Sequence, residues 1–214
     1  MLTLAALAPK FSWYVARSSG IVSWALLTGS VIWGLLLSAR VLNRHTARGW
    51  LLDLHRYLGA LSIVFASVHI AGLVGDNWLH VGWGDILVPM FSKYRPGAVA
   101  WGVVAFYLLV AIEVTSLLRT RLPRRIWRAT HYASFPLFIA CTVHGLQAGT
   151  DAGARPYKWF AVASVSVVMV LIILRIVATR DSPSRRRATA QGGPVGLVHR
   201  SSSLISRPSG RRRG

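Results

Sequence analysis

The sequence predicts an all-α integral membrane protein, a bundle of five transmembrane helices, on three observations. Apolar residues make up 53% of the 214 residues and charged residues only 14%, whereas a soluble domain usually carries about 25% charged residues. The mean hydropathy is +0.47. Five apolar stretches each approach the ~20 residues that cross a hydrocarbon layer of about 30 Å. This composition excludes an ordinary soluble domain.

The five helices are expected, in order, over residues 21–38, 57–75, 98–118, 127–148 and 157–178. The first follows an external segment, 1–19, and is itself followed by arginines, which is typical of an uncleaved anchor. The fourth contains a proline, which is tolerated because lipid forces the backbone to satisfy its hydrogen bonds internally. The helices and their loops form one expected domain, residues 20–180.

Two further segments are not expected to cross the membrane. Residues 76–96 mix Trp, Leu and Gly with few charges, have too few apolar residues to span, and are expected to lie along the outer surface. Residues 181–214 are rich in Ser, Arg, Gly and Pro and cannot bury enough apolar surface to fold. They are expected to form a disordered cytoplasmic tail on anionic lipid, in preference to binding nucleic acid.

The charges predict the orientation. The chain has 25 Lys and Arg against 6 Asp and Glu, a net charge of +19. Nineteen of the basic residues lie in the loops after the first and third helices or from residue 175 onwards, against six on the other side. The positive-inside rule then predicts an external N-terminus and a cytoplasmic C-terminus in the cell membrane. The helices over 57–75 and 127–148 therefore both run from inside to outside.

The single cysteine, Cys141, excludes an internal disulfide, a four-cysteine zinc site and a cysteine-ligated iron–sulfur cluster. No C-x-x-C-H motif for covalent haem is present, nor a glycine-rich nucleotide loop. Metal or cofactor binding, if present, has to use other residues.

The histidines are the candidates for that chemistry. Four of the seven lie on predicted membrane helices, His55 and His69 on one and His131 and His144 on the other. An ionisable side chain at membrane depth is costly and is a functional candidate by default. One such histidine could simply hydrogen-bond across helices, but four, paired on two parallel helices, favour a cofactor. The remaining three, His45, His80 and His199, fall in loops and the tail.

The spacing of the histidines places them at two levels. His55 and His69 are 14 residues apart, a rise of roughly 21 Å, and His131 and His144 are 13 apart, roughly 20 Å. His55 is therefore expected level with His131 near the cytoplasmic face, the inner pair, and His69 level with His144, the outer pair. Facing neutral imidazoles are natural axial ligands for haem iron. The metal ligands are thus expected to be His55 and His131 for an inner iron, and His69 and His144 for an outer iron.

Helical phase suits the two histidines of the second predicted helix better than the two of the fourth. Fourteen residues at about 100° each bring His69 back onto the face of His55, whereas thirteen leave roughly 140° between His131 and His144. Pro136 lies between these two and is expected to kink or rewind the helix.

Charged residues near each level are weaker candidates. Arg56 and Arg128, together with Arg48 and Arg124, could neutralise propionates at the inner level, and Arg95, with Lys93 and Tyr94, could do so at the outer level. Each arginine has a topological or lipid-binding role as its alternative. Glu113, the acid of the third helix, is expected to pair with an arginine or to relay a proton.

Two segments carry a family resemblance: LHRYLGALSIVFASVHI, with His55 and His69, and WRATHYASFPLFIACTVHGLQAGTD, with His131 and His144. They resemble the ferric reductase-like transmembrane domain, the haem core of ferric reductases, NADPH oxidases and the haem subunit of bacterial methionine sulfoxide reductase systems. The likeness covers about residues 12–180. The segments HVGWGDILVPMFSKYRP and TSLLRTRLPRRIWRATH look like those of a stand-alone actinobacterial branch.

The resemblance implies an oxidoreductase subunit with two non-covalent b-type haems. Not all four histidines are present in the sulfoxide reductase subunit, so this sequence is more similar to the two-haem members. Eukaryotic relatives fuse the core to a flavin and nicotinamide domain, which is not expected in this chain. The donor would then be a separate flavoprotein or a quinol, and the external acceptor ferric iron or a partner redox protein. A non-redox membrane anchor and a histidine-lined metal transporter remain as alternatives.

Overall fold

A computed structural model of the chain describes residues 10–39, 47–76 and 81–180. The chain divides into two units, Met1–Val177 and Ala178–Gly214, and the first holds the elements that matter for function. The described residues are all-helical and contain no strand. Four of their helices are long and apolar enough to cross a membrane: Phe11–Ser38, Gly49–Val74, Pro96–Leu117 and Arg155–Val177. The chain is a multi-pass membrane protein, as predicted.

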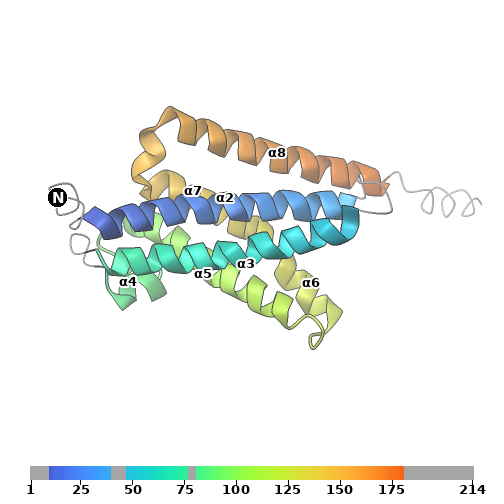
Figure 1. The fold of residues 1–214 in the computed structure, drawn as a ribbon, viewed down its shortest axis with the longest axis horizontal. Coiled ribbons are helices and arrows are strands. Elements are labelled where there is room, and N and C mark those ends of the chain that lie inside the picture. The colour runs from blue at the N-terminus through green and yellow to red at the C-terminus, as the bar shows by residue number, and fades with distance from the viewer. Residues whose placement is uncertain (1–9, 40–46, 77–80, 181–214) are drawn as a thin grey trace, which may run out of the picture. The chain divides into compact units, whose positions relative to one another are not determined.

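The helices follow the predicted order along the chain (Figure 1). They are α2 (Phe11–Ala39), α3 (Ala47–Val74), α4 (Trp83–Leu87), α5 (Pro96–Leu117), α6 (Arg124–Tyr132), α7 (Ser134–Ala148), a 3₁₀ turn η2 (Thr150–Gly153) and α8 (Arg155–Arg180). Both α2 and α3 begin ten residues before the predicted apolar stretches. Their polar flanks keep a helical backbone because each N–H finds its carbonyl within the helix, whether lipid or water surrounds it.

The fourth predicted helix, 127–148, is wrong as a single element, because α6 and α7 are separated at Ala133. The N–H of Ala133 bonds to the carbonyl of Thr130, three residues back, at 3.0 Å, so the chain tightens there. Pro136 explains the position: it lacks an N–H, its ring would clash with the carbonyl of Tyr132, and it is tolerated in the first turn of α7. We call these two helices the α6–α7 arm.

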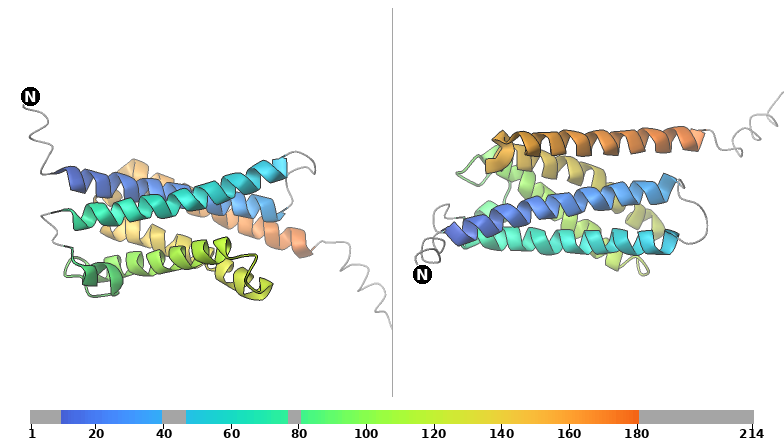
Figure 2. Two further views of the ribbon diagram at one scale, coloured as in Figure 1. Left: turned by 60° about the horizontal axis from the view of Figure 1, so that its bottom comes forward. Right: turned by 45° about the horizontal axis from the view of Figure 1, so that its top comes forward.

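The buried core lies between α2, α5, α7 and α8. Its buried apolar residues are Leu27, Val31 and Leu35 of α2, Ala105, Leu109 and Ile112 of α5, Leu137, Phe138 and Ala140 of α7, and Val168 of α8. α3 packs beside α2 and antiparallel to it (Figure 2). Buried polar bonds add to this packing: the indole of Trp24 donates to Thr142 Oγ1 at 3.1 Å, and Ser23 Oγ donates to the Ser62 carbonyl at 2.9 Å.

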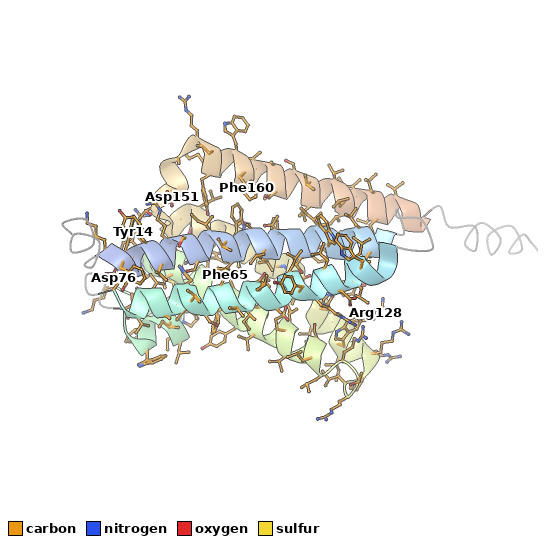
Figure 3. All side chains as sticks on the ribbon, viewed as in Figure 1. Tyr14, Phe65, Asp76, Arg128, Asp151 and Phe160 are labelled. Carbon is orange, nitrogen blue, oxygen red and sulfur yellow. The ribbon has the colours of Figure 1, made fainter. Side chains whose placement is uncertain are left out.

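An ion pair joins α2 to η2 at one end of the first unit. Arg17 of α2 pairs with Asp151 of η2 through two contacts of its guanidinium group. Figure 3 shows Asp151 near the same end as Tyr14, and Arg128 at the opposite end. The start of α2 and the link between α7 and α8 therefore lie at one end, as the predicted topology requires of two external segments.

The segment expected along the outer surface contains the short helix α4. The hydroxyl of Tyr107 on α5 donates to the carbonyl of Leu87 at 2.6 Å and holds α4 against α5. Residues 77–80 of this segment, like the tail 181–214 and residues 1–9 of the predicted segment 1–19, lie outside the described residues. Large apolar side chains are exposed on α8 in particular, for example Val165, Val170 and Ile173. Such exposure suits contact with lipid.

Candidate haem-binding site

Two pairs of histidines face each other between α3 and the α6–α7 arm. The ring centroids of His55 and His131 are 5.9 Å apart, and those of His69 and His144 are 6.3 Å apart. In both pairs the ring planes cross at 80°. Because each residue of α3 meets the partner expected from its level, α3 and the α6–α7 arm run in the same direction. The inner and outer pairs are the ones defined from the sequence.

These separations suit an iron between each two rings. An imidazole nitrogen lies about 2 Å from a bound metal, and about 1.2 Å from the centre of a ring whose bonds are about 1.35 Å. Two rings on opposite sides of one metal therefore have centroids about 6.4 Å apart. Two donors per level match the axial ligation of haem, whereas a tetrahedral ion takes four. Among the described residues, no group of three or more His, Cys, Asp or Glu is placed to hold a metal ion.

Backbone carbonyls fix the rings of the outer pair. Nδ1 of His69 lies 2.6 Å from the carbonyl oxygen of Ala16, and Nδ1 of His144 lies 2.8 Å from that of Ala98. A carbonyl oxygen can only accept, so we assign the proton to Nδ1 of both rings. Nε2 then carries the free lone pair that a metal requires.

The two rings of the inner pair differ in the contacts that hold them. Nδ1 of His55 lies 2.9 Å from the carbonyl oxygen of Ser30 and 3.1 Å from its hydroxyl. Nδ1 of His131 is buried and has no hydrogen-bond partner in the described part of the chain. The ring of His131 instead stacks on Trp127, one turn earlier in α6, at a centroid distance of 5.3 Å.

Buried nitrogen atoms without a partner cluster towards the inner level. In the part of the chain that the structure describes they are Nδ1 of His131 and the indole nitrogens of Trp33 and Trp127. Trp33 is the neighbour of Gly34, which lies against the ring of His55. An indole N–H can only donate, and a buried donor without an acceptor is rare in a folded protein. The inner level therefore fits a group that brings acceptors, as the propionates of haem do.

The two arginines proposed for the inner level are exposed. Arg56 lies 3.6 Å from Asp53, three residues earlier in α3, and Arg128 contacts the hydroxyl of Tyr132 at 3.5 Å. Arg56 directly follows His55 in α3, whereas Arg128 lies three residues before His131 in α6, and each of these contacts joins the arginine to a residue of its own helix. The side chain of Arg48 lies outside the described residues.

Arg95 stands at the outer level. Its guanidinium donates to the carbonyl of Gln147 at 2.6 Å, three residues after His144. Arg95 is also the N-cap of α5 and adopts a left-handed backbone with φ 41°, which is uncommon for a residue other than glycine. The structure thus brings Arg95 to the end of the arm that bears His144. It also lies 5.5 Å above the ring of Tyr94.

Glu113 lies close to the inner level and pairs with no arginine among the described residues. Its carboxylate rests against Gly59 of α3, one turn from His55. The side-chain ion pairs found among the described residues join Arg17 to Asp151 and Arg56 to Asp53. The expected pairing of Glu113 with an arginine is therefore not seen.

Sequence reasoning missed the partners of the histidines. The carbonyls of Ala16, Ser30 and Ala98 carry no signal in residue type, because every residue has a carbonyl. The other three histidines, His45, His80 and His199, fall outside the described residues. One signal was available: Gly20 and Gly34 on α2 are 14 residues apart, the separation of His69 and His55 on the antiparallel helix α3.

Comparison with known proteins identifies the family. The family model described as ferric reductase like transmembrane component matches residues 19–142, which include His55, His69 and His131. His144 lies two residues beyond the matched range. No curated protein and no solved structure matches the chain. The match covers more than half of the sequence, and it confirms the resemblance predicted from the histidine segments: the chain belongs to the family of ferric reductase like transmembrane components.

Proposed function

We propose that this protein is a two-haem cytochrome b that carries electrons across the cell membrane, from a donor on the cytoplasmic side to an external acceptor. The observation that carries the proposal is the pair of histidine levels between two parallel elements, with centroid distances that suit one iron each. Bound haem would supply reversible one-electron chemistry at each level.

The protein's own residues have two tasks in this proposal. The four imidazoles would hold the two irons through Nε2. The carbonyls of Ala16, Ser30 and Ala98 hold the Nδ1 protons and so keep three of the rings in the ligating tautomer. No nucleophile or general base is required, because no covalent bond to carbon, oxygen or phosphorus is made or broken when an electron moves.

The proposed topology has five crossings. The four long helices form four of these crossings. The α6–α7 arm, which is broken at Ala133, forms the remaining one, the fourth in chain order. The N-terminus is external and the C-terminus cytoplasmic, because arginines concentrate in the segments that flank the inner level. Arg56 and Arg128 are proposed to face inner propionates by changing rotamer, and Arg95 to serve the outer level.

The partners follow from this topology. A flavoprotein or a quinol would reduce the inner level, and ferric iron or an external redox protein would oxidise the outer level. The alternative of a histidine-lined metal transporter is less well supported, since each level offers two imidazoles, and no larger donor cluster occurs among the described residues.

The test is the haem content and its dependence on level. The purified protein should hold two extractable b-type haems, with a reduced-minus-oxidised spectrum of low-spin haem. His55→Ala and His131→Ala should each lose the same inner haem, and His69→Ala and His144→Ala the same outer haem, each leaving a haem-to-protein ratio near one. A protein without haem, or loss of the same haem in His55→Ala and His144→Ala, would contradict the proposal.

A further inference from the structure

The outer histidines lie against glycines of neighbouring helices. An ideal Cβ built on Gly20 of α2 would lie 2.8 Å from Nδ1 of His69, and one on Gly102 of α5 would lie 2.7 Å from Nδ1 of His144. Real Cβ atoms essentially never come closer than 3.0 Å to such a neighbour. Neither position can therefore take a larger residue unless the histidine ring moves.

The inner histidine of α3 has a looser version of the same contact. An ideal Cβ on Gly34 would lie 3.2 Å from Cε1 of His55 and 3.5 Å from its Nδ1. Gly29, which lies on α2 between Gly20 and Gly34, meets only a methyl group of Leu58, at 3.5 Å. On α2, a glycine thus contacts a histidine ring at the outer level and at the inner level, whereas Gly29, which lies between them, does not.

Each of the three glycines stands four residues after the carbonyl that accepts the histidine proton. Gly20 follows Ala16, and Gly102 follows Ala98. In a helix this carbonyl already accepts the N–H of the glycine, but a second lone pair remains. Serine and threonine use that lone pair for their own hydroxyl. Glycine has no side chain, so the lone pair is open to the neighbouring helix.

Among the described glycines, none has the ring of the fourth histidine, His131, among its nearest neighbours. His131 lies thirteen residues before His144, which is the histidine that Gly102 contacts. Because α5 runs antiparallel to the arm, the corresponding position on α5 lies thirteen residues after Gly102, at Thr115. The hydroxyl of Thr115 donates to the carbonyl of Ala111 at 2.7 Å. The carbonyl of Ala111 is thus used within α5, and Nδ1 of His131 has no hydrogen-bond partner among the described residues.

We propose that Gly20, Gly34 and Gly102 are positioning residues for the haem ligands. Each opens a helix carbonyl that fixes the proton on Nδ1 of one histidine and directs its Nε2 into the bundle. The outer level has two histidines seated in this way and the inner level has one. The inference rests on the proposed haem sites and adds to them which residues set the orientation and donor strength of each ligand.

The test compares Gly20→Ala, Gly102→Ala and Gly34→Ala with Gly29→Ala as the matched control on the same helix. The readouts are the low-temperature electron paramagnetic resonance signal and the midpoint potential of each haem, measured on purified full-length protein. A hydrogen bond at Nδ1 raises the basicity of the ligand and so favours the ferric state. Losing that bond should therefore raise the potential of the haem concerned.

Gly20→Ala and Gly102→Ala are expected to shift or abolish the outer signal and to leave the inner one unchanged. Gly34→Ala is expected to keep both haems and to change only the inner signal and potential. Gly29→Ala should match the wild type. If Gly20→Ala does not accumulate, Gly34→Ala decides, since its ring has to move by only a few tenths of an ångström.

Two results would overturn the inference: unchanged signals and potentials in Gly34→Ala and in whichever outer variants accumulate, or equal changes in Gly29→Ala, which would indicate helix packing in general. Both leave the proposed function intact, because the wild type would still hold two haems. A wild-type protein without haem would instead contradict the proposed function before any glycine is changed.

Discussion

The indole of Trp127 combines two roles that a conservative substitution can separate. Its ring stacks on His131, and its N–H is buried without an acceptor. In Trp127→Phe the stacking remains possible, but a donor to an inner propionate is lost. We expect the midpoint potential of the inner haem to fall, because the less compensated negative charge favours the ferric state. The outer potential should not change.

Redox titration with separate optical or paramagnetic signals for the two haems measures this difference. Trp101→Phe is the control, since that side chain on α5 is 43% exposed. Equal shifts of both haems in Trp127→Phe would mean that the indole does not act at the inner level.

Thr142 provides a second prediction, about stability. Its Oγ1 accepts the indole N–H of Trp24 across the core and also donates to the carbonyl of Phe138. In Thr142→Val the indole loses its acceptor, which should cost about 0.6 kcal/mol, the average for hydrogen bonds between membrane helices, and at most about 1.7 kcal/mol. Thr115→Val loses only a bond within its own helix and should cost less.

Unfolding of the two variants in mixed micelles gives the comparison. A free energy of unfolding as low for Thr115→Val as for Thr142→Val would show that the interhelical bond to Trp24 contributes nothing measurable.

The histidines of the site could be predicted from the sequence, whereas their partners could not. His55 and His69 are identified by residue type, membrane depth and a spacing that returns to one helical face. The carbonyl of Ala16 is identified only by the register of α2 against α3. Apolar composition does not specify that register, because any apolar face can pack against another.

At the scale of elements, the break in the α6–α7 arm is the feature to test. If Pro136→Ala joins α6 and α7 into one regular helix, thirteen residues leave roughly 140° between His131 and His144. We expect this variant to lose the inner haem and to keep the outer one, because α7 holds most of the buried residues of the arm.

Haem content and the remaining spectrum measure the outcome. Pro96→Ala is the control, since Pro96 starts α5, where a backbone N–H would have no partner within the helix in any case. Two haems in Pro136→Ala would show that packing, and not the proline, maintains the break.

The extents of the helices were predicted only where the chain is apolar. The bounds of α5 agree with the prediction to within two residues, because Pro96 begins the helix where the apolar stretch begins. The starts of α2 and α3 did not agree, since residues such as Arg48 and Asp53 are polar but still helical. Hydropathy reports where lipid lies, and helices continue beyond that layer.

At the scale of the whole molecule, the orientation can be measured directly. A reporter inserted near Asp151 should be external, because Asp151 pairs with Arg17 at the end that is poor in basic residues. A reporter fused after Arg180 should be cytoplasmic, because ten arginines lie from residue 175 onwards. Paired alkaline phosphatase and fluorescent protein fusions distinguish the two sides. The reverse pattern would exchange the donor and acceptor sides.

The distance between the two histidine levels has an electrical consequence. Fourteen residues of α3 separate the levels by roughly 21 Å, about two-thirds of a hydrocarbon layer of about 30 Å. Moving one charge across the whole layer changes its energy by about 2.3 kcal/mol per 100 mV of membrane potential. One electron that passes between the levels therefore changes its energy by about 1.5 kcal/mol at 100 mV. With the proposed orientation, a negative cell interior drives the electron outward and favours reduction of the outer level about tenfold. Each turnover then lowers the membrane potential, so the rate of outward electron transfer would depend on the energy state of the cell.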